Sequence, residues 1–162
     1  MKKCVFAGTF DPPTKGHETV INNCLKLFDE VVVAVMVNTA KAPVFTTEER
    51  VELLKKLYTE NKNVKVISFC GAAVDLLESE NTPFYVRGIR NTVDFEYENQ
   101  NFFANKKLKD DIITIYLPAE QDEIQISSTL VKNSVTFKKD FKYCVPDKIY
   151  TDILTLLENK NV

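Results

Sequence analysis

The sequence predicts a doubly wound α/β domain built around a five-stranded parallel sheet. Five short apolar runs alternate along the 162 residues with segments of helical periodicity, which is typical of a parallel sheet with right-handed crossovers. The run at residues 31–37 has no polar alternation, which favours a strand covered on both faces. Polar loops follow four of the runs, at residues 8–17, 38–43, 87–90 and 118–129. Because ligands in such folds bind beyond the carboxyl ends of the strands, we expect these loops to form one site.

The elements follow one another without a repeat or an interdomain linker, so we expect a single domain over residues 1–162. Strands are expected at residues 3–7, 31–37, 64–69, 82–86 and 112–117. Helices are expected at residues 16–28, from Thr46 onward, at 72–79, at 91–108, from the serines at 127–128 and from Pro146. Thr46 and Glu49 have the spacing of a capping box, the serines are typical of a helix N-cap, and Pro146 suits the first helical position.

Composition is that of an ordinary globular protein, with 44% hydrophobic and 27% charged residues. The formal net charge of -2 gives no general attraction to nucleic acids or acidic membranes, so neither is expected as a partner. No apolar run approaches the ~20 residues that a membrane-spanning helix needs. The N-terminus does not resemble a secretory leader, and the four cysteines are scattered, which predicts free thiols in a reducing cytoplasm.

The loop after the first predicted strand has the features of a phosphate site. It joins Gly8 to a helix whose first turn contains His17, the only histidine. Such a helix start offers unpaired N–H groups and the positive end of the helix dipole, and Gly8 has no side chain to keep a ligand from the backbone. Lys41, Arg87 and Arg90 would surround the same crevice, which favours a small polyanion. Neither a Walker-type loop nor a dinucleotide-binding glycine fingerprint occurs in the sequence.

Three blocks of the sequence together resemble one known family. The first is Gly-Thr-Phe-Asp-Pro at residues 8–12, followed by Thr14-x-Gly16-His17. The second runs from Arg-Gly-Ile-Arg at 87–90 to Asp-Phe-Glu-Tyr-Glu at 94–98, and the third is Ile-Ser-Ser-Thr-Leu-Val at 126–131. In order and spacing they resemble the nucleotidylyltransferase superfamily, and the threonine that replaces the first histidine of His-x-Gly-His resembles its bacterial pantetheine-phosphate adenylyltransferase branch. The resemblance implies a Rossmann-like nucleotidylyltransferase fold.

The resemblance also implies a reaction, in which the adenylyl group of ATP passes to 4′-phosphopantetheine to give dephospho-coenzyme A and pyrophosphate, the penultimate step of coenzyme A biosynthesis. An ionised phosphate attacks the α-phosphorus directly, without a covalent intermediate, so catalysis needs positioning and charge stabilisation rather than a general base. Mg²⁺ is the implied cofactor, held mostly by ATP and water. A homohexamer and feedback inhibition by coenzyme A are implied as well.

The same resemblance assigns roles to single residues. It implies that His17, Lys41 and Arg90 act in catalysis, with His17 donating to the α-phosphate in the transition state. The residues implied in binding 4′-phosphopantetheine are Thr9, Lys41, Ala73 and Arg87. The residues implied in binding ATP are Thr9, Phe10, His17, Gly88, Ile89, Arg90, Glu98, Ile126, Ser127, Ser128 and Thr129, with Glu98 at the nucleoside end. No protein ligand to a metal is implied.

Simpler interpretations of these residues stay open. Thr9 and Asp11 would also suit a turn, Lys41 a solvated surface, and Arg87 and Arg90 a surface ion pair. The aromatic residues of the second block favour the core or a subunit interface over a ligand stack: Phe95, Tyr97, Phe102 and Phe103. The alternative functions are another nucleotidylyltransferase, acting on nicotinamide mononucleotide or an alcohol phosphate, and a non-catalytic nucleotide-binding module of the same fold.

Overall fold

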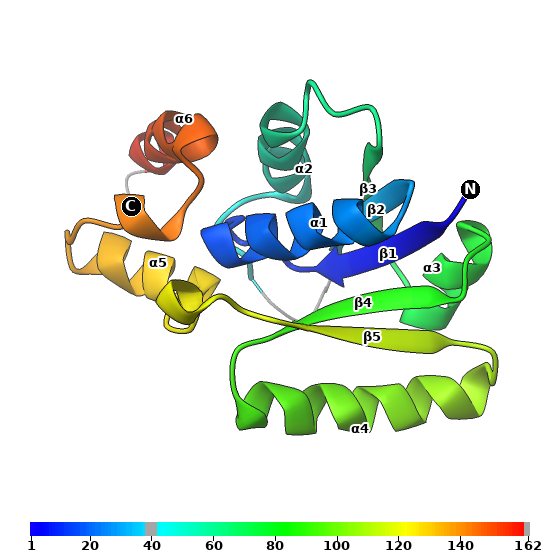
Figure 1. The fold of residues 1–162 in the computed structure, drawn as a ribbon. Helices are drawn as coiled ribbons and strands as arrows, with labels where there is room; N and C mark the ends of the chain where they lie inside the picture. Colours follow the sequence, from blue (N-terminus) through cyan, green and yellow to red (C-terminus); the bar gives the residue numbers. More distant parts are fainter. Residues whose placement is uncertain (38–41, 161–162) are drawn as a thin grey trace.

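The computed structural model describes residues 1–37 and 42–160 and contains a five-stranded sheet whose neighbouring strands are all parallel. The strands are β1 (Lys3–Gly8), β2 (Glu30–Met36), β3 (Val64–Phe69), β4 (Phe84–Ile89) and β5 (Ile113–Pro118). Their order in the sheet is β3-β2-β1-β4-β5 (Figure 1). The order therefore reverses between β1 and β4, which is the doubly wound arrangement, and the predicted fold class is confirmed.

The helices connect these strands and continue beyond the last of them. They are α1 (Lys15–Leu27), α2 (Thr47–Leu57), α3 (Ala73–Ser79), α4 (Thr92–Leu108), α5 (Ser128–Thr136) and α6 (Asp147–Asn159), with 3-10 turns at Gln121–Glu123 and Lys142–Cys144. The capping box of Thr46 and Glu49 forms at the start of α2, and Ser127 caps α5, as predicted. Pro146 is the N-cap of α6 rather than its first helical residue.

The predicted bounds of β4 are wrong at both ends. The strand begins at Phe84 because the Thr82 hydroxyl donates to the Lys3 carbonyl at 2.6 Å and accepts from the Phe84 N–H at 3.3 Å, which makes a turn before the strand. The loop predicted at 87–90 begins later than expected, since Arg87, Gly88 and Ile89 continue β4 and pair with β5. This pairing fixes the direction of the Arg87 side chain, which a loop would leave free.

Helices cover both faces of the sheet. On one face, Phe6 of β1 and Val33 of β2 pack against α1 and against Leu54 of α2. On the other face, Val5 of β1 packs with Leu77 of α3. Successive residues of a strand point to opposite faces, so β1 and β2 contact a helix layer on each side. This explains why both strands are apolar throughout.

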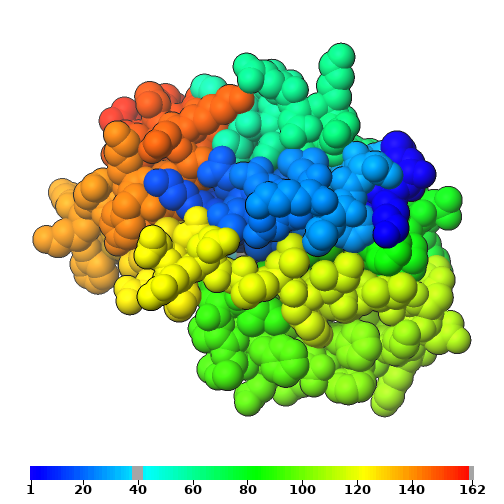
Figure 2. All heavy atoms as spheres, in the orientation of Figure 1, coloured from blue at the N-terminus to red at the C-terminus, as the bar shows by residue number. Residues whose placement is uncertain are grey.

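A third apolar cluster joins α2 to α5 and α6, which lie beyond one end of the sheet (Figure 1). Leu53 of α2, Val131 of α5 and Ile149 of α6 meet in this cluster. The turn at Gln121–Glu123 lies against α1 (Figure 2), where the Thr19 hydroxyl donates to Glu123 at 2.8 Å. These contacts hold the N-terminus of α5 beside the loop that follows β1.

The described helices include none that is both long and apolar enough to span a membrane. Cys4, Cys24 and Cys144 are buried free thiols, and Cys70 is an exposed one.

Candidate active site

A cavity of about 600 Å³ lies at the carboxyl ends of β1 and β4, where the strand order reverses. Its wall is formed by the loop after β1, the first turn of α1, the end of β4 and the start of α5. The predicted site residues that line it are Thr9, Phe10, His17, Arg87, Gly88, Ile89, Arg90, Ile126, Ser127, Ser128 and Thr129. The loops thus converge at one edge of the sheet, as the sequence predicts.

Two predicted site residues, Ala73 and Glu98, do not line the described cavity wall, and a third cannot be placed. Ala73 is the first residue of α3 and packs against the apolar cluster behind the sheet rather than along the described cavity wall. Glu98 is buried in the middle of α4 and does not line the described wall. Lys41 lies outside the described residues.

His17 is held in one orientation by the cap of its own helix. Thr14 is the N-cap of α1, and its backbone N–H donates to His17 Nδ1 at 3.0 Å. Because Nδ1 accepts a hydrogen bond, the neutral imidazole carries its proton on Nε2. The cap therefore leaves Nε2 of His17 as the N–H donor of the ring.

The surroundings of His17 keep its imidazole neutral. Burial, together with the positive charges of Arg90 and Arg87, lowers its pKa from 6.5 to about 4. The Phe10 ring packs edge-on against the imidazole with 4.8 Å between the ring centroids. At neutral pH this histidine is therefore an uncharged hydrogen-bond donor in the cavity wall.

The glycine at position 8 serves a packing role that the sequence does not predict. A Cβ atom built on Gly8 would come within 3.1 Å of the Phe10 ring. Phe10 itself has a φ of 51° and is buried, so its backbone is in the left-handed region, which non-glycine residues rarely adopt. We expected the space beside Gly8 to admit a ligand, and part of it is filled by this ring.

Asp11 fastens the loop after β1 to two other elements. Its carboxylate accepts hydrogen bonds from the backbone N–H groups of Val44 at 3.1 Å and Phe45 at 2.9 Å. Lys132 of α5, which also lines the cavity, donates to the same carboxylate at 3.2 Å. A turn role for Asp11 was only an open alternative, and Lys132 was not predicted. Lys132 lies four residues after Ser128, on the same face of the predicted helix, and this spacing could have indicated that it faces the site.

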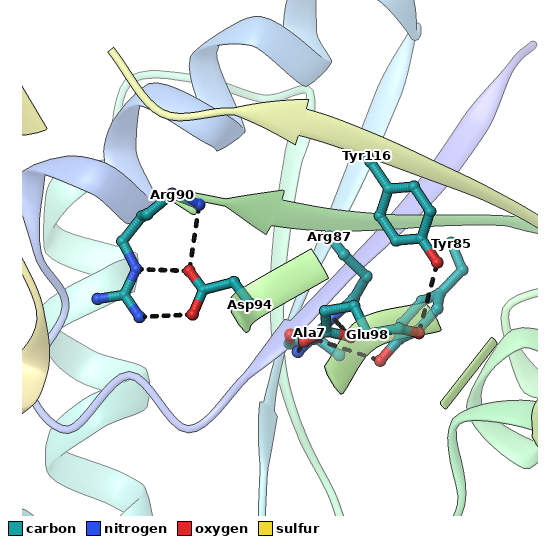
Figure 3. Close-up of polar contacts among 7 residues, drawn as sticks. All are labelled: Ala7, Tyr85, Arg87, Arg90, Asp94, Glu98 and Tyr116. Atoms are coloured by element: carbon teal, nitrogen blue, oxygen red, sulfur yellow. Dashed lines mark hydrogen bonds and ion pairs between the residues drawn. The ribbon is translucent and has the colours of Figure 1, made fainter. Parts of the chain in front are cut away.

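Arg90 directly follows the carboxyl end of β4, and its side chain is partly exposed. Its guanidinium donates to both carboxylate oxygens of Asp94, at 2.8 and 3.0 Å (Figure 3). It also donates to the Ile126 carbonyl at 3.4 Å. Hydrogen bonding to Arg90 lowers the pKa of Asp94 below its ordinary value. The side chain of Arg90 is 37% exposed, so a ligand in the cavity has access to its charge.

Arg87, which the resemblance implies in binding the acceptor, points into the protein and is paired there. Nε and Nη2 donate to the two carboxylate oxygens of Glu98, at 2.8 and 2.5 Å (Figure 3). Nη1 donates to the Ala7 carbonyl and to the Tyr85 hydroxyl. The structure thus brings Arg87 and Glu98 together, although the sequence assigns them to different substrates.

The start of α5 completes the cavity wall. Ser127 Oγ accepts from the Leu130 N–H at 3.0 Å, and Ser128 Oγ donates to the Pro12 carbonyl at 2.8 Å. The second of these bonds ties α5 to the loop after β1. A helix N-terminus directed at a cavity favours a negatively charged group, so this wall suits the phosphates of a nucleotide.

Known proteins are similar to this chain over most of its length. The cytidylyltransferase-like family matches residues 5–134. A phosphopantetheine adenylyltransferase from Clostridium beijerinckii is 41% identical over 155 residues, which cover 96% of this chain and 98% of that protein. One from Clostridium kluyveri is 38% identical over 154 residues, which cover 95% and 94%.

A solved structure has the same fold. It is described as a "Putative Nicotinate-nucleotide Adenylyltransferase" from Vibrio parahaemolyticus, and it superposes with a TM-score of 0.68 over 91% of this chain and 96% of its own. At 22% identity this likeness supports the fold alone. The family match and the long, similar relatives go further: the chain belongs to the phosphopantetheine adenylyltransferases, within the cytidylyltransferase-like family.

Proposed function

We propose that this protein transfers the adenylyl group of ATP to 4′-phosphopantetheine, giving dephospho-coenzyme A and pyrophosphate in coenzyme A biosynthesis. Relatives that share 38% to 41% of its residues over nearly the whole chain have the corresponding name. The observation that carries the proposal for the site is the neutral His17 donor, which shares one cavity with Arg90 and the N-terminus of α5.

The reaction is a direct in-line displacement. The phosphate of 4′-phosphopantetheine is ionised at neutral pH, so it attacks the α-phosphorus without a general base, and pyrophosphate leaves without needing a proton. The Nε2–H of His17 donates to an α-phosphate oxygen as negative charge grows on it, and a donor that is already oriented costs little reorganisation. Because its pKa is about 4, His17 acts here through a hydrogen bond rather than as an acid.

The polyphosphate of ATP lies along Arg90 and the start of α5. Arg90 directly follows β4 and its side chain is partly exposed, and Ser127, Ser128 and Thr129 line the cavity at the start of α5. Both features favour the β- and γ-phosphates. The loop at 88–90 and Ile126 then border the nucleoside.

The acceptor phosphate lies near Thr9, with Lys41 as a further cation and with Ala73 farther along the pantetheine arm. Arg87 contributes its positive charge from the wall while its N–H groups hold Glu98 and Ala7. Glu98 would contact the nucleoside only after releasing Arg87, so we place it in support of Arg87 rather than against ATP.

Mg²⁺ is the proposed cofactor, and it would enter with ATP. Among the described residues no three His, Cys, Asp or Glu side chains gather to hold a metal ion. Asp11, the carboxylate among the described wall residues, is engaged by two N–H groups and Lys132. Phosphate oxygens and water would therefore supply the ligands, as is usual for this ion, and no step above depends on a protein-bound metal.

We further propose that copies of the chain assemble through α4, as a homohexamer acting in the cytoplasm. The exposed large apolar residues of this helix are Val93, Phe95, Tyr97, Phe103 and Leu108. For Phe95, Tyr97 and Phe103 this exposure excludes the core, one of the two predicted environments, and favours a subunit interface.

Coenzyme A is the proposed feedback inhibitor, since it shares the pantetheine arm of the acceptor.

The proposal is tested by pyrophosphate release from ATP and Mg²⁺, with and without 4′-phosphopantetheine, on the wild type and on His17→Ala. We expect release that requires the acceptor, and a fall in kcat by at least about 100-fold in the variant with little change in KM. Release with nicotinamide mononucleotide in place of 4′-phosphopantetheine would favour another nucleotidylyltransferase. ATP binding without turnover on any acceptor would favour a binding module.

A further inference from the structure

A buried arginine on α2 holds the backbone of the loop after β1. Arg50 is 2% exposed, and its Nη1 donates to the Thr9 carbonyl at 2.7 Å. Nε donates to the Thr46 carbonyl at 3.2 Å, and Nη2 donates to the Thr47 hydroxyl at 3.0 Å. Each guanidinium nitrogen therefore bonds to a neutral oxygen, and the side chain ties the first turn of α2 to Thr9.

The position of Arg50 in α2 explains why its side chain is buried. Arg50 lies three, four and seven residues before Leu53, Leu54 and Leu57, which are buried, so it shares their face of α2. Burying a guanidinium is costly unless its donors are satisfied. The planar guanidinium group of Arg50 satisfies this requirement because its three nitrogens reach three acceptors at once, whereas the single nitrogen of a lysine cannot reach all three.

The loop segment that Arg50 holds is fastened at its other end as well. Asp11 is 3% exposed and accepts from the N–H groups of Val44 and Phe45, just before α2. Between Thr9 and Asp11 lies Phe10, with its φ of 51°. Such a backbone persists only where its surroundings enforce it. Arg50 holds the backbone on one side of Phe10, at Thr9, and the Asp11 carboxylate holds it on the other side. Both contacts connect the loop to the N-terminal end of α2 or to the residues just before it.

We propose that Arg50 is a positioning residue for the acceptor phosphate, acting through Thr9. This inference rests on the proposed function, in which Thr9 binds that phosphate beside the α-phosphorus. Arg50 does not line the described cavity wall, so it acts on the loop and not on the substrate. Loss of its bond to the Thr9 carbonyl frees Thr9 to shift, and a misplacement of about 1 Å at a reacting group costs up to about 100-fold in rate.

The test compares Arg50→Lys and Arg50→Met with the wild type, using kcat and KM for 4′-phosphopantetheine in the pyrophosphate release assay. We expect kcat/KM to fall on the order of tenfold for Arg50→Lys and up to about 100-fold for Arg50→Met. Thr47→Val is the matched control. It removes the acceptor of Nη2 and leaves the bond to Thr9, so its kcat/KM is expected within about twofold of the wild type.

A double-mutant cycle with Thr9→Ala separates positioning from general stability. If Arg50 acts through the Thr9 side chain, Arg50→Lys has no further effect in the Thr9→Ala background, to within about twofold. Full additivity of the two effects, or wild-type constants in folded Arg50→Lys, would overturn the inference. Should Arg50→Met fail to fold, Arg50→Lys and the cycle still decide. Wild-type protein without turnover of 4′-phosphopantetheine would overturn the proposed function itself.

Discussion

The neutral, oriented imidazole of His17 is the most direct consequence of the site geometry. Burial, together with the charges of Arg90 and Arg87, lowers its pKa from 6.5 to about 4. A change of this size corresponds to about 3 kcal/mol against the imidazolium form. Because His17 is the only histidine of the sequence, its ring nitrogens give the only imidazole signals in a ¹⁵N-labelled sample.

An NMR titration of these signals from pH 8 to pH 3.5 measures the prediction. We expect a midpoint near pH 4, and a neutral form with the proton on Nε2, because Nδ1 accepts from the Thr14 N–H. Arg90→Gln removes one of the repelling charges and is expected to raise the midpoint. A wild-type midpoint near 6.5, or a neutral ring protonated on Nδ1, would refute the argument.

The same pKa makes the stability of the fold depend on pH. Between about pH 6.5 and 4 the unfolded chain binds a proton on His17 that the folded chain does not, so the free energy of unfolding rises with pH in this window. The contribution of His17 is fully present above pH 6.5, and about 3 kcal/mol is lost as the pH falls to 4. In urea unfolding, the free energy should rise more steeply with pH in the wild type than in His17→Gln. Equal slopes would contradict it.

Two further predictions concern packing and assembly. Gly88→Ala would place a Cβ atom 3.0 Å from Val20 Cγ2, which we expect to destabilise the fold by about 1–3 kcal/mol in thermal unfolding. Gly16→Ala, whose Cβ would meet Thr14 Oγ1 only at 3.8 Å, is the control, and equal melting temperatures of the two variants would refute the packing argument. Sedimentation should show that Phe103→Glu lowers the mass of the assembly relative to the wild type, since Phe103 is 58% exposed on α4, whereas Thr155→Glu on the exposed side of α6 leaves it unchanged. A wild type that sediments as a single 18.5 kDa chain would refute the interface.

Local patterns were sufficient for much of this protein. The alternation of apolar runs with helical segments predicts the sheet, because a strand covered on both faces must be apolar throughout. Thr46 with Glu49, and the serine that caps α5, mark helix starts through hydrogen bonds within four residues. The site also follows from local patterns to a large extent, since parallel strands bring the loops at their carboxyl ends to one edge of the sheet.

Local patterns do not predict which side chains contact each other when they are remote in the sequence. Arg87 and Glu98 are predicted as contacts to two substrates, and they bind each other because β4 and α4 pack together. For Asp11 the sequence leaves a turn role open, and its three partners come from segments more than thirty residues away. In the sequence, Arg50 does not differ from the other charged residues of the α2 segment, and only the packing of α2 shows that it is buried.

The sequence by itself therefore determined the fold class, the strands that carry the site and the family. These depend on periodicity and on short motifs, which act between neighbours in the chain. Only the tertiary structure decided which charges remain available in the cavity, why Gly8 and Gly88 lack side chains, and how the loop after β1 is held. Those features depend on the distances between segments that are remote in sequence, and such distances exist only once the sheet and its helices have packed.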